Sequence, residues 1–252
     1  MASAGIGRSI EGIHSVAAAL AAGRVRKLFV ERKRSEREPL SGLVQKARDM
    51  HIPISVVADA REIATSTTPQ GIVAECSAVP TLSIDVLAAV GHPALIALDH
   101  LQDPQNVGAI ARSALAAGMT GMVISDVRAA PLQATAFKAS VGALETLPLS
   151  VVASVPNALA RLKKAGIWTI GLDADGDGSL FEQELLTEPC VVVVGAEGDG
   201  LSRLARQTCD VVVSIPMAAQ TESLNASVSA ALACFEVLRI RQANTPNESQ
   251  RQ

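Results

Sequence analysis

The sequence predicts an α/β protein in which a domain with a parallel sheet follows a smaller α/β unit. Short, continuously apolar runs alternate with helical segments from residue 94 to residue 241, which is typical of parallel strands covered by helices on both faces. Hydrophobic residues make up 48% of the 252 residues and charged residues 19%, and this composition excludes a disordered chain. A chain of this length can bury a large core.

The N-terminal region mixes helix and strand signals. Apolar residues at helical spacing predict helices, and short apolar runs predict strands. The expected helices span 12–22, which Gly23 ends, and 40–50, and the expected strands span 27–30, 53–57 and 72–74. We therefore expect an α/β domain over residues 1–76 and a linker over 77–92, with a connecting helix at 81–90.

The larger domain is expected over residues 93–242, and a polar, disordered tail over 243–252. Its apolar runs predict strands at 94–98, 121–125, 147–152, 167–172, 191–194 and 211–215. Helices are predicted at 106–117, 135–143, 157–164 and 224–241. In open parallel sheets ligands bind outside the carboxyl ends of the strands, so the loops that follow these strands are the first places to look for a site.

Charge is distributed unevenly along the chain. Residues 1–80 hold 11 Lys and Arg against 8 Asp and Glu, whereas residues 81–252 hold 11 against 17. Aromatic residues make up only 2% of the chain, which argues against base stacking as the main way of holding a ligand. A basic segment fits phosphate contact, although interleaved glutamates also fit an ordinary solvated face. Its members are Arg24, Arg26, Lys27, Arg32, Lys33, Arg34 and Arg37.

Cysteine and histidine usage predicts neither a metal site nor a disulfide framework. The cysteines are widely spaced without a C-x-x-C pair, so we expect reduced, mostly buried thiols at Cys76, Cys190, Cys209 and Cys234. No metal-binding triad is evident among His14, His51, His92 and His100. No uninterrupted apolar stretch reaches membrane-spanning length, and we predict a soluble, cytoplasmic protein that does not bind membranes.

Three loops carry unusual residues for their positions. Asp103–Ser113 places Asn106 and Arg112 at the start of an otherwise apolar helix; this arginine either lies along the apolar surface or holds a phosphate. Gly195–Gly200 reads G-x-x-G-x-G, which is neither a dinucleotide fingerprint nor a P-loop; Glu197 within it also suits a helix N-terminus. Ile215–Ser227 contains Ser223, a good N-cap, and Asn225, expected in the first turn of the last helix.

Together the three loops resemble one family closely. The motifs are the Asn106–Ser113 helix start, the Gly195–Gly200 loop, and Ile215–Met217 followed by Ser223–Ser227. In order and spacing they resemble the SpoU (TrmH-type) RNA 2'-O-ribose methyltransferases of the SPOUT superfamily, and most closely the subgroup of 23S rRNA guanosine-2'-O-methyltransferases. The resemblance covers about residues 6–240, and Gly12–Val16 and Pro69–Ile72 match the edges of the family's substrate-binding domain.

The resemblance implies a fold and a chemistry. The larger domain would be a trefoil knot that binds S-adenosyl-L-methionine, and the smaller one an L30e-like RNA-binding domain. The enzyme would be a homodimer through the knotted domain, acting on ribosomal RNA or a pre-ribosomal particle. Gly195, Ile215, Met217 and Leu224 would contact the cofactor. The catalytic group would comprise Arg112, Asn106, Glu197, Ser223 and Asn225.

The reaction would be attack of a ribose 2'-hydroxyl on a sulfonium methyl group, for which positioning supplies much of the rate. Arg112 would position the RNA and activate the hydroxyl; because arginine stays protonated at neutral pH, its role as base or as electrostatic clamp is left open. The sequence departs from the family pattern at Ala219, where glycine is frequent, and at Pro69, where histidine is frequent. The first departure bears on the shape of the cofactor loop.

Other functions are weighed against this one. Asp173–Glu184 satisfies the EF-hand pattern. A strand rather than a helix is predicted before it, however, and Phe181 stands at the ninth position, so we favour an acidic surface turn over a calcium-binding module. A tRNA substrate is one alternative, and a catalytically silent knotted RNA-binding protein is another. The intact motifs favour an active enzyme.

Overall fold

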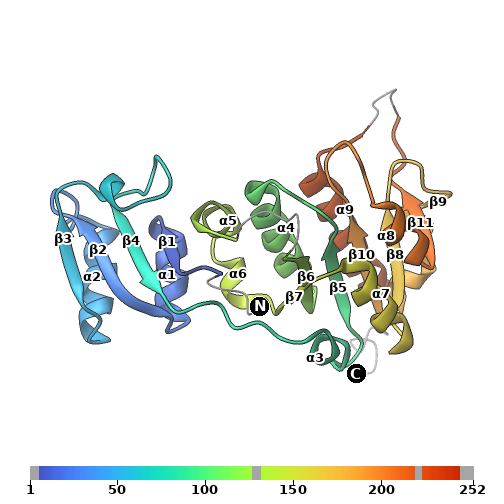
Figure 1. Ribbon diagram of the computed structural model, residues 1–252, viewed down its shortest axis with the longest axis horizontal. Helices are drawn as coiled ribbons and strands as arrows, with labels where there is room; N and C mark the ends of the chain where they lie inside the picture. Colours follow the sequence, from blue (N-terminus) through green and yellow to red (C-terminus); the bar gives the residue numbers. More distant parts are fainter. Residues whose placement is uncertain (1–5, 127–131, 219–222, 245–252) are drawn as a thin grey trace, which may run out of the picture. The chain divides into compact units, whose positions relative to one another are not determined.

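The computed structural model describes residues 6–126, 132–218 and 223–244, and its elements are labelled in Figure 1. The chain forms two compact units. One comprises residues 1–80, 103–112 and 130–146, and the other comprises residues 81–102, 113–129 and 147–252. Each unit contains a sheet and helices of its own.

The first unit contains a four-stranded mixed sheet in the order β1-β4-β2-β3. Its strands are β1 (Ser9–Glu11), β2 (Val25–Glu31), β3 (Ile54–Val57) and β4 (Ile72–Cys76). β4 runs antiparallel to β1 and β2, and β2 is parallel to β3. The helices and short 3-10 turn of this unit are α1 (Ile13–Ala21), α2 (Leu40–Asp49), η1 (Ala60–Glu62), α5 (Ala134–Ser140) and α6 (Ala143–Thr146).

Helix α1 buries Val16 and Leu20, and α2 buries Val44, against a core that includes Ile10 and Leu28. Burial of such aliphatic side chains is the main stabilising contribution in a unit of this size. Ser15 at the start of α1 donates a hydrogen bond to the Phe137 carbonyl of α5 at 3.1 Å, which links these two helices of the unit.

A buried ion pair also joins these segments. Arg24, 5% exposed, directs its guanidinium at Glu145 on α6, with Nε 2.6 Å from Oε2. The same guanidinium donates to the carbonyls of Gly7 and Ser77. These partners satisfy a buried charge that would otherwise cost several kcal/mol.

Glu11 is a buried carboxylate in β1 that accepts four donors from the loop after η1. The donors are the amides and hydroxyls of Thr65 and Ser66; the Thr65 hydroxyl lies 2.7 Å from Oε1 and the Ser66 amide 3.1 Å from Oε2. Burial alone raises the pKa of Glu11, but the hydrogen bonds from Ser66 and Thr65 outweigh it, so the pKa lies below its ordinary value. The charged form therefore stabilises the native unit.

We expect Glu11→Gln to lower the free energy of unfolding at pH 7 by about 1.5–3 kcal/mol, because a charge-assisted acceptor is replaced by an amide that also presents donors. A lowered native pKa contributes stability above the unfolded pKa and loses it as pH falls through the native pKa. The difference between the two proteins should therefore shrink below about pH 4.5. Urea unfolding at several pH values measures it, and equal stability at pH 7 would contradict the assignment.

The second unit contains a seven-stranded sheet in the order β7-β6-β5-β10-β8-β11-β9. Every strand pair in it is parallel. The strands are β5 (Ala94–Leu98), β6 (Gly121–Ser125), β7 (Leu149–Val152), β8 (Trp168–Leu172), β9 (Gly178–Ser179), β10 (Cys190–Val194) and β11 (Val211–Ser214). β5, β6 and β10 are buried along their whole lengths, which explains why their sequences are continuously apolar.

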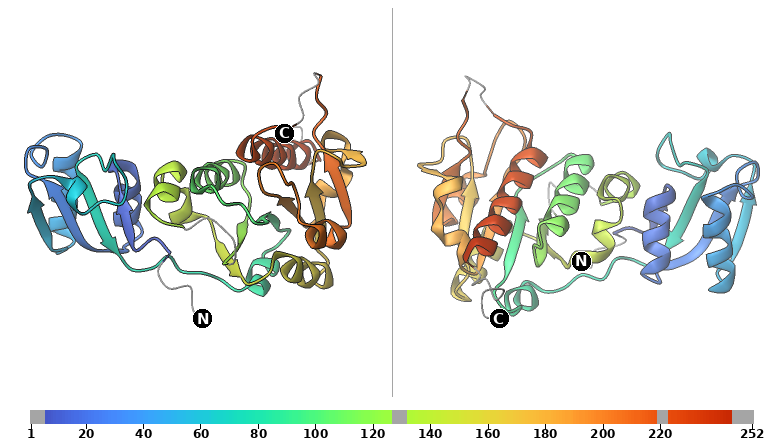
Figure 2. Two further views of the ribbon diagram at one scale, coloured as in Figure 1. Left: turned by 45° about the horizontal axis from the view of Figure 1, so that its top comes forward. Right: turned by 180° about the vertical axis from the view of Figure 1, so that it is seen from behind.

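Helices cover both faces of this sheet. A core on one face joins side chains of α3 (Ile84–Ala88), α7 (Val155–Lys164) and α8 (Arg203–Thr208) to alternate residues of β10, Val191 and Val193. The long helix α9 (Ala226–Asn244) lies on the opposite face, as the right-hand view of Figure 2 shows. Short 3-10 turns η2 (Leu180–Glu182) and η3 (Glu184–Thr187) precede β10, and α4 (Pro104–Ala116) follows β5.

The structure confirms the predicted parallel sheet and differs from the sequence prediction in detail. The short strands β1 and β9 were not predicted, because neither carries a long enough pattern. The helix predicted at 135–143 is broken into α5 and α6 by Val141 and Gly142, whose φ angles are 50° and 92°. The last helix begins at Ala226 and continues to Asn244, into the predicted tail, and residues 245–252 lie outside the described part of the chain.

Candidate functional site

A cleft of about 490 Å³ opens at the carboxyl ends of three neighbouring strands, β8, β10 and β11. All of its described lining residues belong to the second unit. They include the segments that follow each of these strands and the start of α9: residues 172–175, 194–200, 215, 217, 223–226 and 229. This is the edge at which parallel sheets bind ligands.

The loop after β10, Gly195–Gly200, closes on itself. The amides of Ala196 and Gly200 each donate to the other's carbonyl at 3.0 Å. A Cβ on Gly195 would lie 2.0 Å from the Gly200 carbonyl oxygen, so no larger residue fits there. Gly198 and Gly200 have φ angles of 81° and 64°, which favour glycine. The loop therefore presents backbone groups directly to the cleft.

The start of α9 reaches the same loop. Asn225 Nδ2 donates to Glu197 Oε1 at 3.0 Å, and Asn225 Oδ1 accepts from the Ser227 amide at 2.9 Å and from its hydroxyl at 2.6 Å. Asn225 is therefore the N-cap of α9. The expectation that Ser223 caps this helix is wrong, because the helix begins at Ala226, three residues after Ser223. Ser223 instead lines the cleft.

The lining combines apolar side chains with carboxylates. The apolar lining residues are Leu172, Val194, Ile215, Met217 and Leu224. The acidic lining residues are Asp173, Asp175, Glu197 and Asp199. The glycine backbone and the apolar side chains of such a cleft suit a ligand with a flat apolar part. The carboxylates suit a ligand that also carries a positive charge. The predicted cofactor-contacting residues Gly195, Ile215, Met217 and Leu224 all line it. Ala219, the departure noted in the sequence, lies outside the described residues.

The first motif lies on α4. Asp103 begins this helix: its Oδ1 accepts from the Gln105 amide at 2.9 Å, and its Oδ2 accepts from Asn106 Nδ2 at 3.1 Å. Asn106 is buried, and Arg112 is exposed. Neither residue is among the described residues that line the cleft. The structure thus brings together Glu197, Ser223 and Asn225 from the predicted catalytic group.

Within the basic segment, one prediction needs correction. Arg24 is buried in its ion pair with Glu145, so it cannot meet a phosphate at the surface. No local pattern around Arg24 indicates this pairing, because Glu145 lies 121 positions further along the chain. Arg26, Arg32, Lys33, Arg34 and Arg37 are exposed. Lys27 is half-buried, with its Nζ 4.6 Å from the centroid of the Phe29 ring.

The EF-hand-like segment Asp173–Glu184 binds an arginine of the same chain. Strand β8 leads into it, as predicted. Arg206 on α8 takes the position of a cation: its Nη1 lies 3.1 Å from Asp173 Oδ1, and its Nη2 donates to the Asp175 carbonyl at 2.7 Å. A Cβ on Gly176 would lie 2.3 Å from the Val213 backbone, so this acidic turn packs directly on β11. Among the described residues, no group of three or more metal-ligating side chains gathers.

The four thiols are free, and three of them are buried. Burial raises the pKa of Cys76 and Cys190 to about 11 and that of Cys209 and Cys234 to about 12. At neutral pH they stay protonated and weakly nucleophilic. Among the described helices, none has the length and apolar character that crossing a membrane requires.

Comparison with known proteins agrees with this geometry. The SpoU rRNA methylase family model matches residues 93–235, and the model for RNA 2'-O ribose methyltransferase substrate binding matches residues 9–82. The 23S rRNA (guanosine-2'-O-)-methyltransferase RlmB of Photobacterium profundum is 36% identical over 92% of this chain and 98% of its own length. An uncharacterized tRNA/rRNA methyltransferase of Mycolicibacterium vanbaalenii is 42% identical over 86% of this chain and 71% of its own length.

Solved structures agree as well. The crystal structure of the SpoU methyltransferase AviRb from Streptomyces viridochromogenes, in complex with the cofactor AdoMet, covers 93% of this chain and 90% of its own, with a TM-score of 0.79 and 27% identity. The family model spans more than half of the chain, and a relative of similar length is more than 30% identical. The chain therefore belongs to the SpoU rRNA methylase family.

Proposed function

We propose that this protein is an S-adenosylmethionine-dependent methyltransferase that modifies a ribose 2'-hydroxyl, of a guanosine, in large-subunit ribosomal RNA. The observation that carries the proposal is the cleft at the ends of β8, β10 and β11, where the second and third motifs of the family meet. The similarity to the RlmB enzymes, which are named 23S rRNA (guanosine-2'-O-)-methyltransferases, supports the choice of RNA and nucleoside.

The cleft fits the cofactor. S-adenosylmethionine supplies a methyl group on a positively charged sulfur. The backbone of Gly195 would border its adenine together with the apolar side chains of Ile215 and Leu224, with Met217 nearby. The acidic side chains that line the same cleft complement the positive charge. Few aromatic residues are needed for this mode of binding, in agreement with the composition.

The reaction needs a hydroxyl held in line with the methyl group. Glu197 and Asn225, which hydrogen-bond to each other at 3.0 Å, would fix the loop and the start of α9. Ser223 and Asn106 would order the surroundings of the reacting atoms. Arg112 is exposed on α4 and would hold the RNA phosphate bidentately while its charge favours the developing alkoxide.

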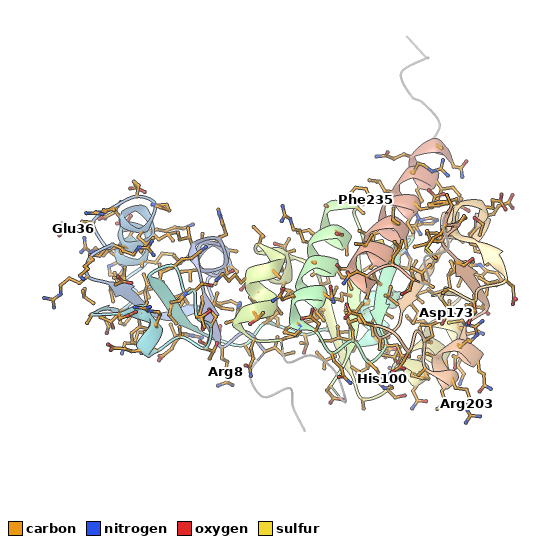
Figure 3. The ribbon with its side chains drawn as sticks, turned by 90° about the horizontal axis from the view of Figure 1, so that it is seen from above. Arg8, Glu36, His100, Asp173, Arg203 and Phe235 are labelled. Atoms are coloured by element: carbon orange, nitrogen blue, oxygen red, sulfur yellow. The ribbon has the colours of Figure 1, made fainter. Side chains whose placement is uncertain are left out.

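We also propose the assembly. Residues 1–76 would form the substrate-binding domain, 77–92 the linker, and 93–242 the methyltransferase domain, folded as a trefoil knot. A homodimer would form through the knotted domain and bring Arg112 to the reacting centre at the subunit interface. Val228, Leu232 and Phe235 support this: they are 47%, 37% and 48% exposed and share one side of α9, where a second copy would cover them. Phe235 is labelled in Figure 3.

The RNA would meet the first unit through its exposed cations. Arg26, Arg32, Lys33, Arg34 and Arg37 are available for phosphate contact, which provides affinity without reading sequence. Substrate would be ribosomal RNA or a pre-ribosomal particle in the cytoplasm.

The test is methyl transfer from radiolabelled S-adenosylmethionine to unmodified large-subunit rRNA, small-subunit rRNA and tRNA. We expect label in large-subunit rRNA only, at one linkage that resists alkali because its 2'-oxygen is blocked. Label in tRNA would replace the proposed substrate. Cofactor binding without label in any RNA or ribosomal particle would contradict the proposed enzyme and favour a silent RNA-binding protein.

A further inference from the structure

Two carboxylates hold the chain just after the glycine loop Gly195–Gly200. Asp99 directly follows β5, and its Oδ2 accepts from the Ser202 amide at 2.8 Å. Asp173 directly follows β8, and its Oδ2 accepts from the Leu201 amide at 3.1 Å. Strands β5 and β8 are the two neighbours of β10, the strand from which the loop departs. Consecutive amides are thus held from both sides.

The loop between these anchors and β10 has little freedom of its own. Ala196 and Gly200 are paired through two backbone hydrogen bonds, and the Gly195 backbone packs against Gly200. A Cβ on Gly200 would lie 2.7 Å from Asp173 Oδ2, so the absence of a side chain there is what lets the carboxylate approach. Whatever fixes Leu201 and Ser202 therefore fixes the whole loop.

Asp99 differs from Asp173 in one respect. Asp173 lines the cleft, whereas Asp99 does not and is 1% exposed. Its Oδ1 has no hydrogen-bond partner among the described residues, and the imidazole Nδ1 of His100 lies 3.8 Å away. Keeping a buried carboxylate with an unsatisfied oxygen is costly. A neutral amide would also accept from Ser202, but a carboxylate accepts the bond more strongly.

We infer that Asp99 is a positioning residue for cofactor binding, acting through the Ser202 amide to hold the glycine loop against the cleft. Asp173 anchors the same loop from inside the cleft and keeps Arg206 in place on α8. The inference rests on the proposed function, because it assigns the cleft to S-adenosylmethionine. It adds that the affinity for this ligand depends on a side chain that never touches it.

The experiment compares the full-length protein with Asp99→Asn, Asp99→Ala and a matched control, Asp210→Asn. Like Asp99, Asp210 accepts a hydrogen bond from a backbone amide: its Oδ2 lies 2.9 Å from the Thr169 nitrogen, and its Oδ1 lies 2.8 Å from Lys163 Nζ. Thr169 belongs to strand β8, so Asp210 contacts the sheet and not the glycine loop. Titration calorimetry gives the dissociation constant of S-adenosylmethionine, and thermal unfolding reports the fold. Hydrogen exchange of residues 195–202 reports the loop.

We expect Asp99→Asn to weaken cofactor binding about three- to tenfold, because the amide oxygen still accepts from Ser202 but more weakly. Asp99→Ala should weaken binding by more than about tenfold, because it removes the acceptor. Amide exchange in 195–202 should speed up in both, and kcat at saturating cofactor should change less than KM. Asp210→Asn should lower thermal stability and leave cofactor affinity within about twofold of the native value.

The outcomes separate the two claims. Native affinity and native loop exchange in Asp99→Asn, in a protein that binds S-adenosylmethionine normally, would overturn the inference and leave the proposed function standing. If the unaltered protein does not bind S-adenosylmethionine, the proposed function fails and the inference fails with it. Because the Asp99→Asn change is isosteric, it decides the matter even if Asp99→Ala does not fold.

Discussion

Arg112→Ala is expected to lower the rate of methyl transfer to RNA by about 10²–10³-fold, the usual loss when one preorganised charged donor is removed from a reacting centre. Arg112 is exposed on α4 and is absent from the described lining of the cleft. Its removal should therefore leave the dissociation constant of S-adenosylmethionine and the thermal stability nearly unchanged. Single-turnover transfer from labelled cofactor measures the rate, and calorimetry measures binding.

Two companion variants sharpen this result. Arg112→Lys keeps the charge but loses the planar, bidentate donor set, so it should recover only part of the rate. Arg203→Ala removes another exposed arginine, from α8, labelled in Figure 3, and should keep native activity. Transfer by Arg112→Ala at the native rate would show that the first motif acts only in folding or assembly.

Gly195→Ala is expected to abolish measurable binding of S-adenosylmethionine. Its Cβ would lie 2.0 Å from the Gly200 carbonyl oxygen and 2.4 Å from the Leu201 nitrogen, and both atoms are backbone. The loop must open to admit a methyl group there, so its pairing between Ala196 and Gly200 and its anchors at Leu201 and Ser202 are disturbed together. Calorimetric titration measures binding, and circular dichroism verifies that the sheet is retained.

Gly198→Ala provides the matched control in the same loop. A Cβ on Gly198 meets nothing within 4 Å, although its φ of 81° makes alanine strained. The cost is about 1–2 kcal/mol of backbone strain, and much of the cofactor affinity should persist. Equal loss of binding in both variants would mean that backbone strain, rather than the closed shape of the loop, governs the site.

The sequence was most informative where structure is local or periodic. Strands β5 and β10 are predictable because burial on both faces makes their sequences continuously apolar. Two helices are predictable because their periodic apolar pattern stops at a glycine, Gly118 in one and Gly166 in the other. Two of the three loops that the sequence singles out, 195–200 and 215–227, contribute to the lining of the cleft, since residues after parallel strands meet at one edge of the sheet. The third, 103–113, is absent from the described lining, whereas Asp173 and Asp175 of the predicted acidic surface turn belong to it.

Short or broken elements were harder to predict. β9 has two residues and pairs with β11, and its formation depends on that neighbour rather than on its own pattern. Because serine is a good N-cap, the sequence predicts that Ser223 caps α9, yet Asn225 holds that position. A cap depends on where the helix begins, which the contact between Asn225 and Glu197 helps to set.

The sequence by itself determined the α/β class, the parallel sheet and the motifs that meet at the cleft. Only the tertiary structure decided the partners of individual charges: Arg24 faces Glu145 across 121 positions of the chain, Asp173 faces Arg206, and Asp99 faces the Ser202 amide across 103. The physical reason is that hydrophobic periodicity repeats along the chain, whereas a charged side chain meets its partner only after distant segments have packed together.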